Sequence, residues 1–511
     1  MHQNNKQYKL NPSTENTGVS IHPACIVGYF LTNLIHRVLG TNYPTMLCKF
    51  RDGTNQWANN LEGGNDISLA TIARIKSDAS FVDDVYRKYN IEANKFASII
   101  SQLWSTDHNS TISSLLNLYH NYNNQYKETY LSSWLPLGAE GLNANLSNEL
   151  TYRLAERINK YAIGVSIGEC FSALTKPSTP SVRQREQIDL SKIHAQLLSI
   201  LPDYPNINLN LSKLIRNDHN LYEMLRQHYE QYRWMSFDYE GPELPYEHFE
   251  FELINRVQKG LDPSEIKNKI INEIDQNIYF ANKLWNQLRI DDDSELAKLI
   301  KIAQLFTLWK GEQQELLFQS YHAIDHVLSL IADNLNIEKG LLRYLLPEEF
   351  NGFVENHRPD LAILKDRRQY CVLLFEQGNV SIFLHKEADN IWDQKVEKEG
   401  IKETEILHGQ SAFAGKVRGI VKIVNEIGEM DKVEKGDVLV SSKTNPNLVP
   451  AMVRASAIVT DYGGLTCHAA ILSFELQIPT VVGTRFATKI LSDGMLVEVD
   501  AHEGKVIIIK D

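Results

Sequence analysis

Apolar residues recur at intervals of three and four over most of the chain between residues 20 and 365, as in helices that bury one face. Clusters of glycine and proline interrupt this pattern at residues 138–141, 177–181, 202–205 and 241–245, where we expect turns or loops. The pattern therefore predicts a large, mostly α-helical domain. The clearest series are Leu146, Leu150, Leu154, Ile158, Ala162 and Val165; Leu296, Leu299, Ile300 and Ala303; and Leu317, Ile324, Leu328 and Ile331.

The hydrophobic pattern changes after residue 368. Two apolar runs at residues 371–375 and 380–384 flank a short turn that contains Gly378, which predicts a β-hairpin. Residues 386–405 are highly charged and are interrupted by Gly400, which is typical of an exposed hinge. We therefore expect a flexible N-terminus over residues 1–20, a helical domain over 21–368, a hairpin and hinge over 369–408, and a separate C-terminal domain over 409–511.

Composition is typical of a soluble protein with two or three domains. The chain has 511 residues, of which 43% are hydrophobic and 23% are charged. A net charge of -12 argues against a nucleic-acid partner, because phosphate contacts need clustered Lys and Arg. Residues 21–39 are moderately apolar but include polar side chains, so we expect a buried helix there and no membrane span. Five cysteines without paired spacing and an N-terminus without a signal-peptide pattern indicate a cytoplasmic protein.

The segment around His468 carries the strongest chemical signal. Residues 458–459 end an apolar run that predicts a buried strand, Gly463 and Gly464 permit a tight turn, and Thr466 can cap a following helix. His468 then lies near free backbone N–H groups, which favour an anion and keep the imidazole neutral. A neutral imidazole is a nucleophile that can carry phosphate. A core histidine at a helix start is the alternative, and the surrounding sequence decides between the two.

Short motifs surround His468 in a consistent order. They are residues 409–419, 436–440, 444–446, 455–461, 478–484, 493–494 and 499–506, together with Met452. In this order they resemble the mobile phosphohistidine domain of the phosphoenolpyruvate-utilising enzymes, the family of phosphoenolpyruvate synthase and pyruvate phosphate dikinase. The resemblance implies an α/β swivelling domain in which His468 is phosphorylated. It also implies that Gly463, Gly464, Thr466 and Cys467 support the phosphoryl site through their backbone.

One position departs from the family pattern. Where the family usually has an arginine six residues beyond the histidine, this chain has Phe474. If that arginine helps to hold phosphate, its replacement bears directly on phosphoryl transfer. A non-catalytic regulatory or scaffold homologue, which keeps the swivelling fold and accepts no phosphate, is therefore one alternative.

Complete enzymes of this family combine an ATP-grasp domain that phosphorylates the histidine, the mobile domain and a barrel that binds pyruvate. A (β/α)₈ barrel needs about 250 residues, and only seven residues follow Gly504. The first 400 residues lack the alternating strands and Gly-rich loops of an ATP-grasp fold. We therefore expect ATP and Mg²⁺ to bind a separate ATP-grasp partner subunit, and we expect no metal site in this chain.

A helical domain ahead of a phosphohistidine domain resembles the latter part of rifampin phosphotransferase. The resemblance implies a phosphotransferase in which His468 passes phosphate to a small-molecule hydroxyl acceptor in the helical domain. A phosphocarrier subunit of a split phosphoenolpyruvate synthase-like complex is the other alternative. A pocket within reach of His468 favours the transferase, whereas a filled helical domain favours the carrier or scaffold. Scattered landmarks of the helical domain are Thr175, Lys176, Pro177, Ser181, Glu186, Tyr232, Arg233, Trp234, Tyr246, Phe249, residues 342–349, Arg367 and Arg368.

Three further features have both a functional and a structural interpretation. His322 and His326 stand four residues apart and could share a metal, but no third ligand lies at zinc spacing, so we expect a solvated helix face. Glu348 or Glu349 could act as a base, although a surface or capping role is the simpler prediction. The aromatic residues between positions 229 and 249 could line an acceptor pocket, but a core is expected.

Overall fold

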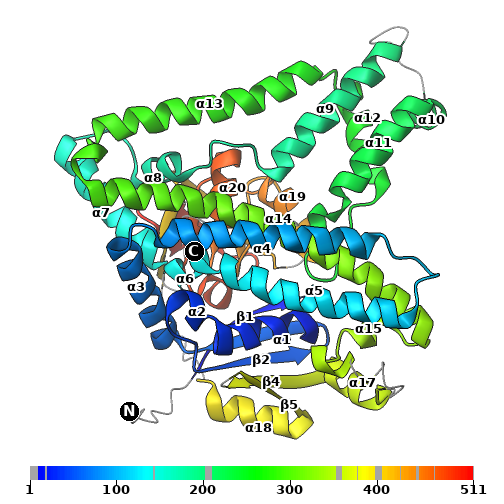
Figure 1. Cartoon of the computed structure of the whole chain (residues 1–511). Helices are drawn as coiled ribbons and strands as arrows, with labels where there is room; N and C mark the ends of the chain where they lie inside the picture. The colour runs from blue at the N-terminus through cyan, green and yellow to red at the C-terminus, as the bar shows by residue number, and fades with distance from the viewer. Residues whose placement is uncertain are drawn as a thin grey trace.

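The computed structural model describes residues 10–17, 20–141, 144–201, 210–350, 352, 359–376, 378–397, 405–425, 427–444, 448–464 and 467–509. Figure 1 distinguishes three parts: a helical body, a five-stranded sheet at one end of it, and a C-terminal α/β domain coloured orange and red. The prediction of a large helical region followed by an α/β domain is therefore confirmed.

The helical body is organised around α14 (Ser294–Leu335), a 42-residue helix that is buried along much of its length. α4 (Phe81–Trp104) and α5 (Ile112–Ser133) pack side by side against it. The predicted apolar series from Leu146 to Ile158 is buried on α7 (Asn145–Tyr161). The remaining helices of the body are α1 (Ile21–Tyr29), the π-helix η1 (Phe30–Leu34), α2 (His36–Leu39), α3 (Leu61–Ser77), α6 (Leu135–Glu140), α8 (Ile167–Thr175), α9 (Val182–Ile200), α10 (Leu211–Asn217), α11 (His219–Tyr232), η2 (Arg233–Ser236), α12 (Tyr246–Gln258), α13 (Pro263–Gln287), η3 (Ile290–Asp292), α15 (Lys339–Leu342), η4 (Pro347–Phe350) and α17 (Leu361–Gln369).

The five-stranded sheet combines strands from the first 60 residues with strands that follow the helical body in the sequence. Its strands are β1 (Asn11–Thr17), β2 (Thr45–Arg51), β3 (Thr54–Asn59), β4 (Tyr370–Glu376) and β5 (Asn379–Leu384), in the order β1-β3-β2-β4-β5. All neighbours are antiparallel. The predicted hairpin is confirmed as β4–β5, but it belongs to this sheet and is not part of a linker.

Three predictions about this region are wrong in detail. The N-terminus predicted to be flexible contains β1, and the region predicted to be helical contains β2 and β3. Residues from the predicted hinge form α18 (His385–Lys395), which packs on β4, β5 and β2. β2 lies in the centre of the sheet, with Met46, Cys48 and Phe50 buried on one face and Leu47 on the other, and its partner β4 is distant in the chain. Residues 398–404 of the predicted hinge lie outside the described residues, and the domain division itself stays a prediction.

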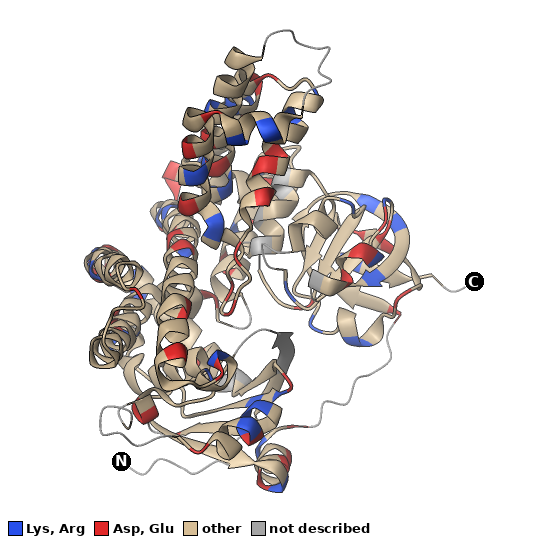
Figure 2. Cartoon of the chain, turned by 90° about the vertical axis from the view of Figure 1, so that its right-hand side faces the viewer, with Lys and Arg blue, Asp and Glu red and all other residues tan. Residues whose placement is uncertain are grey.

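The C-terminal domain contains an eight-stranded sheet in the order β6-β13-β12-β8-β9-β10-β11-β7. The central strands β8 to β11 are parallel, and antiparallel strands flank them. In the view of Figure 2 this domain is a lobe beside the helical body. Its elements are β6 (Ile406–His408), β7 (Gln410–Phe413), β8 (Lys416–Ile423), η5 (Ile427–Lys432), β9 (Val438–Ser441), α19 (Val449–Met452), β10 (Ala457–Thr460), α20 (His468–Leu476), β11 (Thr480–Val482), α21 (Ala487–Ile490), β12 (Leu496–Asp500) and β13 (Lys505–Ile508).

The moderately apolar residues 21–39 form α1, η1 and α2, and most of their side chains are buried in the main core. The prediction of a buried helix is therefore confirmed. None of the helices that the structure describes is both long enough and apolar enough to cross a membrane.

Helices α9 to α12 enclose a second apolar core, and a polar group lies within this bundle. His194 on α9 is fully buried, and neither of its ring nitrogens has a hydrogen-bond partner among the described residues. Burial lowers the pKa of His194 from 6.5 to about 4, and the charge of Arg256 adds to the shift. A buried polar group without a partner destabilises a fold.

We expect His194→Leu to stabilise the protein by about 1 kcal/mol, the lower end of the range for removing an unsatisfied buried polar group. The gain should be larger at pH 5 than at pH 8. The folded-state pKa lies below the unfolded value, so the unfolded chain binds the extra proton and wild type loses stability as the pH falls from 6.5 towards 4. Urea unfolding of both proteins at the two pH values measures this difference, and an equal gain at both would contradict the assignment to His194.

Candidate functional site

The loop between β10 and α20 has the predicted strand–turn–helix form. β10 ends at Thr460, and His468 is the first residue of α20. Thr466, the expected cap, lies outside the described residues, and the N-cap position belongs to Cys467 with extended backbone angles. The structure describes the backbone of His468 but not its side chain. The backbone therefore places this histidine at a helix N-terminus, where an anion is favoured.

The two glycines of this loop are required for different reasons. Gly463 has a φ of +119°, and a Cβ there would lie 2.7 Å from Sγ of Cys467. At Gly464 a Cβ would lie 2.8 Å from Cβ of Ala144, a residue of the helical body. Gly463 therefore lets the loop close on itself, and Gly464 lets the loop touch the helical body.

Asp461 fixes the start of the loop. Its buried carboxylate accepts hydrogen bonds from Oγ1 of Thr484 at 3.1 Å and from the backbone N–H of Thr488 at 3.2 Å, and the Thr488 hydroxyl also donates to it. Burial raises the pKa of Asp461, although these hydrogen bonds oppose the shift. The loop is thus tied to the start of α21 before it reaches the glycines.

The C-terminal domain is docked on α7 and α8 of the helical body. A Cβ at Gly168 of α8 would lie 2.8 Å from the backbone oxygen of Ser411 on β7. Nε2 of Gln410 donates a hydrogen bond to Oδ1 of Asn148 on α7. Small side chains of β7 and α20 share one apolar cluster with Phe171 of α8. These small side chains are Ala412, Ala469 and Ala470.

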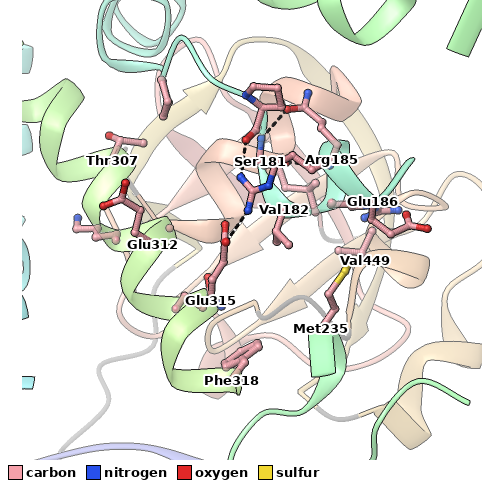
Figure 3. A pocket seen from close by; sticks show the side chains of 18 of the residues that line it. Ser181, Val182, Arg185, Glu186, Met235, Thr307, Glu312, Glu315, Phe318 and Val449 are labelled. Atoms are coloured by element: carbon pink, nitrogen blue, oxygen red, sulfur yellow. Dashed lines mark hydrogen bonds and ion pairs between the residues drawn. The ribbon is translucent and has the colours of Figure 1, made fainter. Parts of the chain in front are cut away.

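A pocket of about 1410 Å³ lies between the docked C-terminal domain and the helical body. Helices α9, α12 and α14 and the turn η2 form its helical side, and Figure 3 shows Val182, Met235 and Phe318 among the side chains around it. The C-terminal domain completes the wall with Val449, Pro450, Val453, Gly463, Gly464, Cys467 and Leu472. The loop that precedes His468 therefore borders a pocket whose other walls belong to the helical body.

Lys310 of α14 lies where the pocket meets the histidine loop. Its Nζ is 4.0 Å from Oε1 of Glu140, and Glu140 also accepts hydrogen bonds from the backbone and hydroxyl of Ser147. Burial lowers the pKa of Lys310, while the charges of Glu140 and Cys467 oppose the shift. Burial also favours the neutral form of the Cys467 thiol, whose pKa it raises. Lys310 thus places an amine paired with Glu140 near the residue directly before His468.

A second ion pair crosses the pocket further along α14. Nη2 of Arg185 on α9 lies 2.5 Å from Oε2 of Glu315, and its Nη1 donates to the backbone oxygen of Pro180 (Figure 3). Burial raises the pKa of Glu315 despite this arginine. Glu312, also in the pocket wall, accepts a hydrogen bond of 3.0 Å from the hydroxyl of Tyr86. The pocket wall therefore carries two carboxylates, of which Glu315 is the one whose neutral form burial favours.

Several landmarks predicted from the sequence come together in this pocket. Lys176, Pro177, Ser181, Glu186, Trp234 and Phe249 all line it. The aromatic residues between positions 229 and 249 thus contribute both to the pocket wall and to a core, because Tyr232 and Phe249 also belong to the α9–α12 core. Sequence reasoning missed Lys310, because it begins the polar run Lys310–Glu315 and does not stand out from the other charged residues of α14.

The other candidates have structural roles. Nε2 of His322 pairs with Oε2 of Glu243 at 2.5 Å, and the ring is buried, so the predicted solvated helix face is wrong. His326 bonds instead to the backbone oxygen of Thr106. Glu349 accepts a hydrogen bond from the backbone N–H of Leu346 and pairs with Arg367, which is the predicted capping role. No group of three His, Cys, Asp or Glu side chains within the described part of the chain could hold a metal ion.

Comparison with known proteins finds relatives of the C-terminal domain. Residues 433–504 match the family described as PEP-utilising enzyme, mobile domain. A probable phosphoenolpyruvate synthase of Archaeoglobus fulgidus is 48% identical over 136 residues, which are 26% of this chain and 18% of the relative. The phosphoenolpyruvate synthase of Pyrococcus furiosus is 54% identical over 111 residues, which are 22% of this chain and 14% of the relative. The matched segments thus span less than a fifth of each relative, and the predicted resemblance to this family's mobile domain is confirmed.

A third relative, a probable phosphoenolpyruvate synthase of Methanothermobacter thermautotrophicus, is 50% identical over 114 residues, or 22% of this chain and 17% of the relative. Among solved structures, holo aconitase X of Thermococcus kodakaraensis aligns with 21% of this chain and all of its own, at 20% identity and a TM-score of 0.17. A score of that size carries no argument about fold.

We expect Gly464→Ala to weaken docking of the C-terminal domain, because the new methyl group would overlap Cβ of Ala144, and overpacking costs about 1–3 kcal/mol. Cleavage by trypsin between residues 397 and 405 should become faster. The paired variant Ala144→Gly/Gly464→Ala removes the overlap and should restore the wild-type rate. An unchanged rate in Gly464→Ala, or no rescue by Ala144→Gly, would contradict the docking contact.

Proposed function

We propose that this chain is a phosphotransferase component in which His468 receives a phosphoryl group and passes it to a hydroxyl acceptor held by the helical body. The observation that carries the proposal is the pocket lined jointly by the helical body and by Gly463, Gly464 and Cys467. A filled helical body would have favoured a carrier or scaffold instead. The similarity of residues 433–504 to the mobile domain of PEP-utilising enzymes supports a phosphohistidine at this position.

Loading takes place away from the pocket, on a separate ATP-grasp subunit that binds ATP and Mg²⁺. The neutral imidazole of His468 forms an N–P bond as the bond between the phosphoryl group and the nucleotide breaks. Backbone N–H groups at the start of α20 hold the phosphoryl oxygens, and the helix dipole favours their charge. The C-terminal domain then moves to the docked position described above.

Transfer takes place in the docked position. The acceptor hydroxyl oxygen forms a bond to phosphorus as the N–P bond breaks, and a carboxylate of the wall such as Glu312 or Glu315 takes the hydroxyl proton. Glu140 pairs with Lys310 and favours its protonated form, in which the lysine supplies positive charge beside the histidine loop. This cation comes from the helical body and offsets the arginine that Phe474 replaces.

One observation favours each of two alternative functions. Phe474 in place of the family arginine favours a regulatory or scaffold protein that never accepts phosphate. The similarity of the C-terminal domain to phosphoenolpyruvate synthases favours a phosphocarrier of a split phosphoenolpyruvate synthase-like complex. The pocket favours the transferase over both. The five cysteines are free thiols, which fits a cytoplasmic location.

We expect His468→Ala to abolish phosphorylation and to change the unfolding free energy by no more than about 1 kcal/mol, as for sites outside a core. With labelled ATP and an active ATP-grasp partner, wild type should carry an acid-labile, base-stable phosphoryl group on His468, identified by peptide mapping. Without the partner it should stay unlabelled. Failure to label wild type would favour the scaffold, and labelling of His468→Ala would move the carrier to another residue.

A further inference from the structure

One face of α14 forms a wall of the pocket. Among the α14 residues that line the pocket, a series around Gly311 repeats at intervals of three and four, and Lys310, Glu312 and Gln313 line the pocket beside it. The series is Thr307, Leu308, Gly311, Gln314, Glu315 and Phe318. Gly311 lies at the centre of the series and is exposed. From Thr307 to Phe318 the face extends for about 16 Å at 1.5 Å per residue. Bare helix backbone is therefore presented to the middle of the pocket.

The fold does not explain why residue 311 is a glycine. A Cβ at this position would meet no atom within 4 Å, and its backbone does not have a positive φ. Gly138, Gly168 and Gly464 differ, because a Cβ at each would lie 2.8 Å from a neighbouring atom. Glycine inside a helix costs about 1 kcal/mol relative to alanine. Neither packing nor backbone geometry therefore accounts for a glycine in the interior of this long helix.

We infer that the acceptor binds at Gly311, a position called the seat below. There a flat, mainly apolar, uncharged ring that bears a hydroxyl lies directly on the backbone of α14. The inference rests on the proposed function for naming the ligand an acceptor. Glycine is the residue that allows a ligand to approach a backbone most closely. Val182, Met235 and Phe318 supply apolar surface around this seat (Figure 3).

Three cations of the pocket wall already have a carboxylate partner, which favours an uncharged ring. Arg185 is paired with Glu315, Arg256 with Glu252, and Lys310 with Glu140. Gly311 and the histidine-loop residues Gly463, Gly464 and Cys467 line the same pocket, so a ring on Gly311 shares that pocket with the loop. A hydroxyl on the edge of the ring towards the loop is placed for transfer, while the face of the ring determines which compounds are accepted.

Binding of 1-pyrenemethanol, a flat apolar alcohol, tests the inference. Energy transfer from tryptophan, including Trp234 in the pocket wall, reports the affinity. We expect Gly311→Ala to weaken binding about tenfold and to leave the unfolding temperature unchanged or raised. Gly428→Ala, at another glycine with open space around it, should leave the affinity unchanged. Equal affinity of Gly311→Ala and wild type, a lowered unfolding temperature, or no binding by wild type would overturn the inference.

The same proteins separate this inference from the proposed function. Probe binding needs neither ATP nor a partner, and Gly311→Ala should be phosphorylated on His468 as fast as wild type by the ATP-grasp subunit. Normal probe results without phosphorylation of any protein would overturn the proposed function alone. Normal phosphorylation with no effect of Gly311→Ala on the probe would overturn the seat alone.

Discussion

The contact between Gly464 and the start of α7 is the constraint on which the rest of the arrangement depends. A Cβ at Gly464 would overlap Ala144, so the histidine loop approaches the helical body as closely as a backbone allows. This approach brings Cys467 to the pocket edge and closes the pocket with residues of the C-terminal domain. Asp461 and Gly463 fix the loop from the opposite side, within its own domain. The same few residues therefore determine both the loop conformation and the place where its domain docks.

The helices and the hairpin could be predicted because their signals are local. Apolar spacing on α7 and the turn around Gly378 each lie within one element or between two adjacent ones. The five-stranded sheet could not be predicted, because β2 pairs with β4 across more than three hundred residues and no local signal indicates that pairing. α18 was missed for a related reason: it is rich in charge and buries little more than Ala388 against that sheet.

The histidine loop was largely predictable, and the pocket was not. The strand, the two glycines and the helix start follow from residues 458–468, except that Cys467 takes the N-cap position expected of Thr466. The pocket joins residues from Leu137 to Leu472, and only folding brings them together. Gly311 left a local signal, namely a glycine in the interior of a long helix, whereas Lys310 is one of several charged residues of that helix. Neither residue indicates a function until the neighbouring surface is known.

Chemical crosslinking between α7 and β7 tests the docked arrangement most directly. The side chains of Asn148 and Gln410 meet at this interface, so cysteines at both positions should be joined within one molecule by a short bis-maleimide. We expect the intramolecular 148–410 crosslink in most molecules of Asn148→Cys/Gln410→Cys, identified by peptide mapping, and none in either single variant. Absence of this crosslink, with both cysteines shown to be reactive, would contradict a pocket shared between the helical body and the histidine loop.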